Sequence, residues 1–226
     1  MEFTFFLAAF IVLCIGAAIF AWRAAEKRRK ALEAFAADHG LAFDPDPDPT
    51  LIDRFSGMAP FDRGSDRRVS NRIHGRRGEV DWELFDYRYT TGSGKNRRTH
   101  HFGVVVACVP LLFPRMTLRA EGLFDKVASL VGYDDINFES HEFSSRYHVS
   151  GADRKRCYDL IHPRMIEFLM TLPRYHWQFD GNRIVIHLAG SQHPQTMADI
   201  MSAIGGFLER IPDYVRKDIG FRPANA

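Results

Sequence analysis

The residues best suited to chemistry lie close together near position 140. Glu139, His141 and Glu142 occupy one short segment of the chain. A carboxylate and an imidazole can exchange protons near neutral pH, so this segment could support the acid–base steps of a hydrolytic reaction. Solvated or helix-capping carboxylates are much commoner than catalytic ones, and no GxSxG nucleophile elbow accompanies them. These three residues are therefore the candidates of an enzymatic alternative, not of the preferred interpretation.

The ten histidines do not fall into a metal-binding pattern. The sequence has no HExxH, no CxxC and no pair of histidines four residues apart on a predicted helix. His100 and His101 are neighbours in a predicted strand, where adjacent side chains point to opposite faces. The segment 92–95 resembles part of a phosphate-binding loop, but a strand and not a helix follows it. We therefore expect neither a metal ion nor a cofactor.

The composition is that of an ordinary globular protein, but its charge is unevenly distributed. The 226 residues include 30 Lys+Arg and 28 Asp+Glu, and 46% are hydrophobic, which argues against a disordered chain. Three cysteines are too few for a disulfide scaffold. Residues 23–30, 63–77 and 88–98 carry net charges of +4, +5 and +4, more than the +2 of the whole chain, so the remainder is acidic.

Two of these basic stretches fall in neighbouring turns or loops of one predicted sheet. They could simply be solvated, they could bind nucleic acid, or they could face an anionic membrane, where each Lys or Arg contributes about 1 kcal/mol. No nucleic-acid-binding motif accompanies them, which disfavours nucleic acid. The candidate residues of this anion-binding surface are Arg67, Arg68, Arg72, Arg76, Arg77, Lys95, Arg97 and Arg98.

Residues 3–22 form an uncharged apolar run that predicts a membrane anchor. About 20 residues at a rise of ~1.5 Å span the ~30 Å hydrocarbon core of a bilayer, and Trp22 suits the interface. A cleaved signal peptide would need basic residues before a shorter apolar run, and here the order is reversed. The basic juxtamembrane residues follow the run, which predicts an N-terminus outside and a cytoplasmic remainder: Arg23, Lys27, Arg28, Arg29 and Lys30.

The rest of the chain reads as a helix, a stiff linker and one domain. Residues 23–39 are rich in Ala, Lys and Glu and precede Gly40, which suits a helix C-terminal cap. Leu32, Phe35 and Ala36 follow helical spacing, so this helix should pack on the domain. Alternating Asp and Pro at positions 44–49 favour an extended segment. We therefore divide the chain into an anchor (1–22), a juxtamembrane helix with its linker (23–49) and a soluble domain (50–226).

The domain should have an α+β fold with a mostly antiparallel sheet and packed helices. The apolar phase changes between Leu84 and Phe85, which indicates either a β-bulge or a strand covered on both faces. Asp180-Gly181 between two alternating runs predicts a hairpin turn. We expect strands at 69–73, 79–90, 102–109, 135–139, 146–149, 175–179 and 184–188, and helices at 123–131, 153–161, 163–172 and 196–211.

Several segments resemble a family of uncharacterised bacterial proteins, common in actinobacteria, with a membrane anchor and a soluble domain. The similar segments are Phe85-Asp86-Tyr87-Arg88-Tyr89-Thr90 with its GSGK loop and valine-rich strand, Asn137 to Phe143, Tyr147-His148-Val149 with Asp153, and His162-Pro163-Arg164-Met165. The resemblance covers residues 79–190. It implies a membrane-anchored bacterial protein and supplies no reaction, cofactor or catalytic residue.

Together these features predict a single-pass, membrane-anchored cytoplasmic binding or scaffold domain. Its partners would be the membrane itself, anionic lipid headgroups or a membrane protein. A membrane-associated hydrolase that uses the carboxylates and histidines near position 140 is one alternative. A nucleic-acid-binding module that uses the arginine-rich loops is the other.

Overall fold

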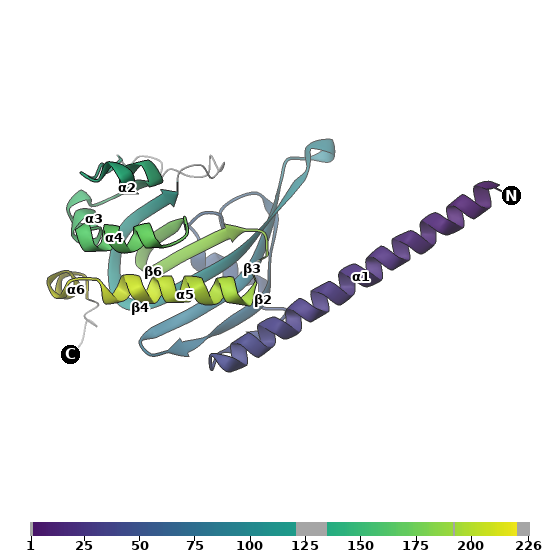
Figure 1. Ribbon diagram of the computed structural model, residues 1–226, viewed down its shortest axis with the longest axis horizontal. Helices are drawn as coiled ribbons and strands as arrows, with labels where there is room; N and C mark the ends of the chain where they lie inside the picture. Colours follow the sequence, from purple (N-terminus) through teal and green to yellow (C-terminus); the bar gives the residue numbers. More distant parts are fainter. Residues whose placement is uncertain (1, 121–134, 192, 221–226) are drawn as a thin grey trace.

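The protein is built around one six-stranded antiparallel sheet (Figure 1). The computed structural model describes residues 2–120, 135–191 and 193–220, apart from the side chains of residues 2–5, 8 and 9. The strand order is β1-β2-β3-β4-β5, and β6 pairs with β4. The strands are β1 (Ala42–Asp44), β2 (Ser65–Arg77), β3 (Val80–Thr91), β4 (Arg98–Ala120), β5 (Tyr147–Gly151) and β6 (Trp177–Ala189). The predicted α+β class with a mostly antiparallel sheet is confirmed.

Helices cover one face of the sheet, and a short segment covers the other. The helices are α1 (Glu2–Asp38), α2 (His141–Arg146), α3 (Arg154–Leu160), α4 (Pro163–Thr171), α5 (Pro194–Glu209) and α6 (Asp213–Ile219). They enclose the larger hydrophobic core with Trp82 and Leu84 of β3. On the opposite face the 3-10 helix η1 (Pro49–Phe55) and residues 58–61 enclose a second core with Phe85, Tyr87 and Tyr89.

These two cores explain the change of apolar phase in β3. The register between β3 and β4 is continuous from Asp81 to Thr91, without a bulge. Successive residues of a strand point to opposite faces, so even-numbered apolar residues enter one core and odd-numbered ones the other. Of the two alternatives left by the sequence, the strand covered on both faces is the one observed. The predicted central strand at 102–109 is also present, inside the longer β4.

The hairpin predicted around Asp180-Gly181 is wrong, because residues 177–189 form the single strand β6. Its two halves both pair with the long strand β4, from Gly103↔Leu188 to Leu118↔Trp177. A two-residue type I′ turn needs positive φ at both positions. Only Gly181 has it, at 56°. The register between β4 and β6 shifts on either side of Phe113↔Gly181. Gly181 therefore lies at an irregularity in the pairing of two strands, and the chain does not reverse direction there.

The remaining predicted elements agree in part. The helices expected at 153–161, 163–172 and 196–211 correspond to α3, α4 and α5. Residue 135 forms only an isolated bridge with Ser150, and no strand forms over 135–139. The helix expected at 123–131 lies outside the described residues. The sequence did not predict α2 or α6, which span only 6 and 7 residues.

α1 is one continuous helix with two different environments. Its C-terminal part packs on the sheet through Leu32, Phe35 and Ala36, as the sequence predicted. It ends in a Schellman motif, in which the Leu41 amide bonds the Ala36 carbonyl and Gly40 adopts φ 67°. The N-terminal part projects away from the domain (Figure 1). In the part of the chain that the structure describes, no helix is long and apolar enough to cross a membrane, so the anchor at residues 3–22 stays a prediction.

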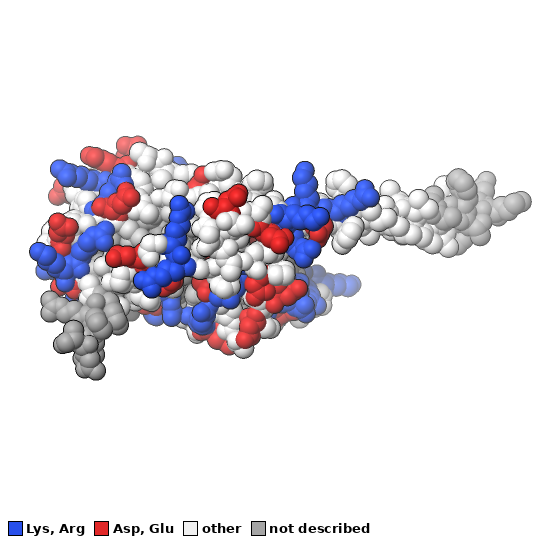
Figure 2. Space-filling model, turned by 90° about the horizontal axis from the view of Figure 1, so that it is seen from below, with Lys and Arg blue, Asp and Glu red and all other residues white. Residues whose placement is uncertain are grey.

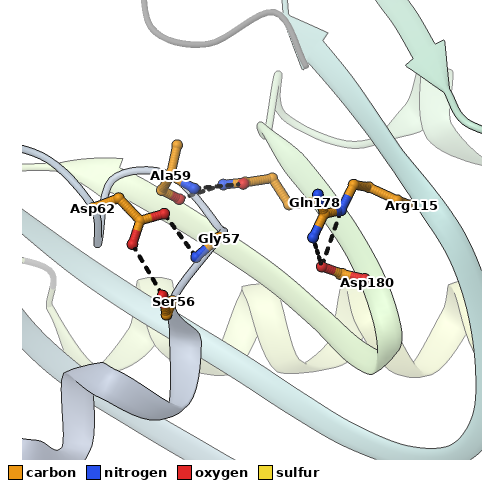
Figure 3. Close-up of polar contacts among 7 residues, drawn as sticks. All are labelled: Ser56, Gly57, Ala59, Asp62, Arg115, Gln178 and Asp180. Carbon is orange, nitrogen blue, oxygen red and sulfur yellow. Dashed lines mark hydrogen bonds and ion pairs between the residues drawn. The ribbon is translucent and has the colours of Figure 1, made fainter. Parts of the chain in front are cut away.

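The segment between η1 and β2 is held against β6 by a buried amide (Figure 3). Gln178 is 6% exposed. Its Oε1 accepts a hydrogen bond from the Ala59 amide at 3.0 Å, and its Nε2 donates to the Ala59 carbonyl at 2.6 Å. The same Nε2 lies 3.3 Å from Nδ1 of His187. Burial and the neighbouring His176 lower the pKa of His187 to about 3, so this ring is neutral and Nδ1 can accept the bond.

We predict that Gln178→Leu destabilises the fold by about 2–4 kcal/mol. Leucine has a similar size, but it leaves the half-buried backbone amide and carbonyl of Ala59 without the Gln178 partner, and each unsatisfied group costs roughly 1–3 kcal/mol. Urea unfolding followed by tryptophan fluorescence measures the loss. Gln195→Leu is the matched control, because Gln195 is exposed and its side chain bonds the exposed Asp199, while its backbone bond to His193 survives the substitution. Its change should stay within about 0.5 kcal/mol, and equal effects of the two variants would contradict the assignment.

Candidate functional site

The point where α1 leaves the sheet is fixed by an ion pair. Arg28 of α1 donates two hydrogen bonds to Asp86 of β3, at 2.6 and 2.9 Å. Asn71 of β2 donates a third bond to the same carboxylate at 2.8 Å. The Asp86 side chain is 12% exposed and that of Arg28 is 25% exposed. A bidentate, half-buried pair of this kind fixes geometry as well as adding stability.

The local backbone explains how Asn71 reaches this pair. Asn71 has a φ of 52°, a conformation that asparagine tolerates better than most residues. It lies in the interval of β2 where the register with β3 shifts, between Ser70 and Ile73. Such irregularities turn a side chain toward a new direction. A cavity of about 290 Å³ lies at this junction, and Ala25, Arg28, Ser70, Asn71, Asp86, Arg88 and His101 are among its lining residues.

Beyond this junction α1 exposes large apolar side chains. The exposed fraction is 69% for Phe6, 70% for Leu13, 77% for Phe20 and 66% for Trp22. The juxtamembrane basic residues follow, and Figure 2 shows Lys and Arg gathered where α1 leaves the domain. Arg29 and Lys30 pair with Glu26 within the helix, whereas Arg23 and Lys27 are exposed. The helix therefore presents an apolar part, a basic part and a part packed in the core, in that order.

The structure separates the predicted anion-binding residues into two groups. Lys95 and Arg97 lie in the β3–β4 connection, which includes the 3-10 helix η2 (Gly94–Asn96), and Arg98 is the first residue of β4. The start of β2 lies beside the end of β3, with Ser65 opposite Thr90, so Arg67 and Arg68 belong to the same end of the sheet. Arg76 and Arg77 lie at the other end of β2, where Arg77 faces Val80 across the turn.

At the β3–β4 end, one carboxylate partly balances the positive charge. Asp66 has a φ of 50° and lies 3.4 to 3.6 Å from the guanidinium groups of Arg68, Arg88 and Arg97. Arg67 instead donates to the Phe61 carbonyl at 2.9 Å. Each exposed pair contributes only about 0–1 kcal/mol. One carboxylate cannot neutralise three arginines, so the β3–β4 end of the sheet keeps a positive charge.

Arg72 serves a different purpose from the other predicted residues. It donates two hydrogen bonds to Glu83, each 2.7 Å long, and Arg54 donates a third at 2.6 Å. Burial raises the pKa of the Glu83 carboxyl, but the bonds from the two arginines outweigh this and hold the pKa below its usual range. Arg72 is therefore tied into the fold. Together with Arg54 of η1 it binds Glu83 of β3, and this shared carboxylate links η1 to the sheet.

The three catalytic candidates do not converge on one site. Glu139, His141 and Glu142 are all exposed at the start of α2. Only Glu139 lines a groove of about 490 Å³, which also contains Ser140, Tyr158, His162 and Glu167. Within the described residues no group of three His, Cys, Asp or Glu side chains could hold a metal ion. His162 and Glu167 were missed as site residues because His162, the N-cap of α4, and Glu167, on α4, lie more than twenty residues along the chain from Glu139.

Other candidate groups have ordinary surroundings. His100 bonds Thr91 and stacks on Tyr89, whereas His101 lines the cavity beside Asp86, so the two side chains face opposite sides as predicted. Cys157 is fully buried, and burial raises the pKa of its thiol to about 12. That thiol is therefore unreactive at neutral pH.

One solved structure shares this fold. The crystal structure of the mycobacterial trehalose monomycolate transport factor A, TtfA, is similar to the chain with a TM-score of 0.63. The similarity covers 86% of this chain and 97% of that chain at 12% sequence identity, and it shows a common fold. Neither a protein-family model nor a curated protein matches the chain. The predicted resemblance to actinobacterial proteins thus finds a mycobacterial structural neighbour, while the family itself stays a prediction.

We predict that Asp86→Asn loosens α1 from the sheet. The substitution removes the charge that Arg28 binds, and it should lower the free energy of unfolding by about 1–3 kcal/mol. The amides of residues 23–31 should then exchange with deuterium faster than in the original protein, as measured by mass spectrometry. Glu26→Gln is the control, because Glu26 pairs only within α1 among the described contacts. Unchanged exchange in the Asp86 variant would show that core packing alone holds the helix.

Proposed function

We propose that this protein is a membrane-anchored, non-catalytic binding or scaffold protein. The observation that carries the proposal is the divided environment of α1. Leu32, which is fully buried, belongs to the core, while Phe20 is 77% exposed on the same helix. A contiguous exposed apolar surface of this kind marks a contact with a membrane or a partner. Residues 6–22 of α1 are therefore the part that needs a second molecule to cover it.

A bilayer suits this part of α1 better than a protein surface does. The run from residue 3 to residue 22 contains no charged residue and ends at Trp22, and basic residues follow it directly. Exposed apolar side chains point in many directions around the helix, from Phe10 to Val12, Leu13 and Ile15. A protein partner would cover one side of a helix, whereas lipid covers all sides. The basic residues favour a cytoplasmic domain by the positive-inside rule.

The fixed junction gives the anchored domain a defined orientation. The Arg28–Asp86 pair holds α1 against the sheet. Figure 1 shows that the β3–β4 connection and the free part of α1 project from the same side of the domain. Lys95, Arg97 and Arg98 would therefore approach the surface of the membrane that holds α1. There they would meet the headgroups of anionic lipids, whose attraction for each basic residue is about 1 kcal/mol.

The structural neighbour is compatible with a role without catalysis. Its name describes a transport factor for trehalose monomycolate. We propose by analogy that this protein assists a process at the membrane as an accessory factor. The enzymatic alternative has one supporting observation, the groove that joins Glu139 to His162 and Glu167. The nucleic-acid alternative has no supporting observation, since the predicted basic residues divide between the two ends of strands β2 and β3.

The first test replaces apolar side chains of α1. The full-length protein should remain in the membrane fraction after an alkaline carbonate wash. The double variant Leu13→Asp, Ile15→Asp should be released, because each charge near the centre of a bilayer costs about 3 kcal/mol or more. Leu112→Asp, Tyr214→Asp is the matched control, since both residues are exposed apolar residues of the domain. Release of the original protein by the wash would contradict membrane anchoring.

The second test examines the orientation. In nanodiscs that contain anionic lipid, amides of residues 90–99 should exchange more slowly than in nanodiscs of neutral lipid, and high salt should remove the difference. The variant Lys95→Glu, Arg97→Glu should abolish this protection. The variant Arg76→Glu, Arg77→Glu makes the same change in charge at the β2–β3 turn, which lies at the opposite end of these strands. It should leave the protection of residues 90–99 intact. If both double variants remove the protection equally, the proposed orientation is wrong.

A further inference from the structure

A groove lies at the end of the domain remote from the projecting part of α1. It is formed by the segment before α2, the end of α3 and the start of α4, and Figure 1 places these helices far from the N-terminus. Its volume of about 490 Å³ falls within the range of roughly 300–1,000 Å³ that is usual for binding sites. An anchored protein would hold this groove away from the lipid, where another molecule can reach it.

The walls of the groove are apolar and held in place by their own contacts. Phe138 packs edge-on against Phe143, with ring centroids 5.4 Å apart, and against Tyr158 at 5.0 Å. The Tyr158 hydroxyl donates to the Asn137 carbonyl at 2.8 Å. Ile161, at 1% exposure, belongs to the main core and also lines the groove. Because aromatic contacts and a hydrogen bond fix these side chains, the groove exists without a ligand and little ordering is needed on binding.

The charge of the groove is one-sided. Its described lining residues include two carboxylates, Glu139 and Glu167, and no Lys or Arg, although Arg154 bonds the Tyr158 hydroxyl at 3.3 Å beside it. Both glutamates are exposed, and within the described residues neither forms an ion pair or a side-chain hydrogen bond. By contrast, Asp86 is tied to Arg28 and Glu83 to Arg72. The groove therefore offers two free negative charges beside an apolar surface.

We propose that this groove binds a peptide segment of another protein that carries a large apolar side chain next to a lysine or arginine. The apolar side chain would fill the space between Phe138, Tyr158 and Ile166, and the cation would lie beside Glu139 or Glu167. Electrostatic complementarity at the rim selects the partner and its register, while apolar burial supplies most of the affinity. An anionic lipid does not fit, because the same carboxylates repel it. The inference rests on the binding role in the proposed function, and it does not depend on membrane anchoring.

The test is a selection of short random peptides, displayed on phage, against the full-length protein in nanodiscs. Enriched peptides should pair an aromatic or aliphatic residue with Lys or Arg. Their affinity should fall about tenfold or more for Glu139→Lys, Glu167→Lys, since the favourable contact of the peptide cation with a carboxylate becomes a repulsive one at either position. Glu33→Lys, Glu209→Lys is the matched control, because both residues are exposed carboxylates outside the groove, and it should bind as the original protein does.

Three results would overturn the groove assignment: no enrichment, enrichment of acidic peptides, or equal binding by the groove variant and the original protein. A circular dichroism spectrum and thermal unfolding of each variant exclude loss of folding as the cause. Phe138→Ala provides a second probe, which should weaken binding without any change of charge. Peptide binding by a protein that carbonate releases from membranes would leave the groove standing and reject only the anchor.

Discussion

The carboxylate of Asp86 is the polar constraint that ties α1 to the sheet. It accepts bonds from α1 and from β2 at the same time, through Arg28 and Asn71. A half-buried carboxylate loses hydration, and three hydrogen bonds with a paired charge offset that loss. The consequence is geometric: the helix that projects from the domain leaves it at a fixed place and in a fixed direction. Both the orientation of the basic hairpin and the remote position of the groove depend on that direction.

Polar side chains also hold the layers of the other face together. Glu83 links η1 to β2 through Arg54 and Arg72, and Gln178 binds the backbone of Ala59 in the loop that follows η1. These groups are adjacent to the second core, whose buried apolar residues come from β3, β4, β6 and a short segment. Apolar burial is non-directional, so it cannot by itself fix where a short segment lies on a sheet. The buried amide and the ion pairs supply that position.

The sequence predicted local features well and long-range pairing poorly. Periodicity identified β3, the central part of β4, α4, α5 and the cap at Gly40, because these depend on neighbours in the chain. The hairpin at Asp180-Gly181 failed because its turn signal is equally compatible with a bulge, and only the length of β4 decides between them. Counting arginines identified the basic stretches, but not that Arg72 is paired with Glu83 or that Arg76 and Lys95 lie at opposite ends. Glu139 was noticed, whereas His162 and Glu167 were not, since folding alone brings them together.

The small net charge of +2 conceals a difference between charges that are paired within the fold and charges that are exposed on the surface. Within the fold, arginines and carboxylates neutralise one another, as at Asp86 and Glu83, and such pairs contribute to geometry more than to solubility or binding. Exposed cations lie at the base of α1 and on the β3–β4 connection, and two carboxylates line the groove between α2 and α4, whose end of the domain also exposes Arg154, Lys155 and Arg164. The groove is thus a local acidic and apolar site on a surface of mixed charge, at the opposite end of the domain from the base of α1. Because a rigid junction separates the two ends, binding at the groove need not disturb contacts at the base of α1, which is the arrangement that a scaffold requires.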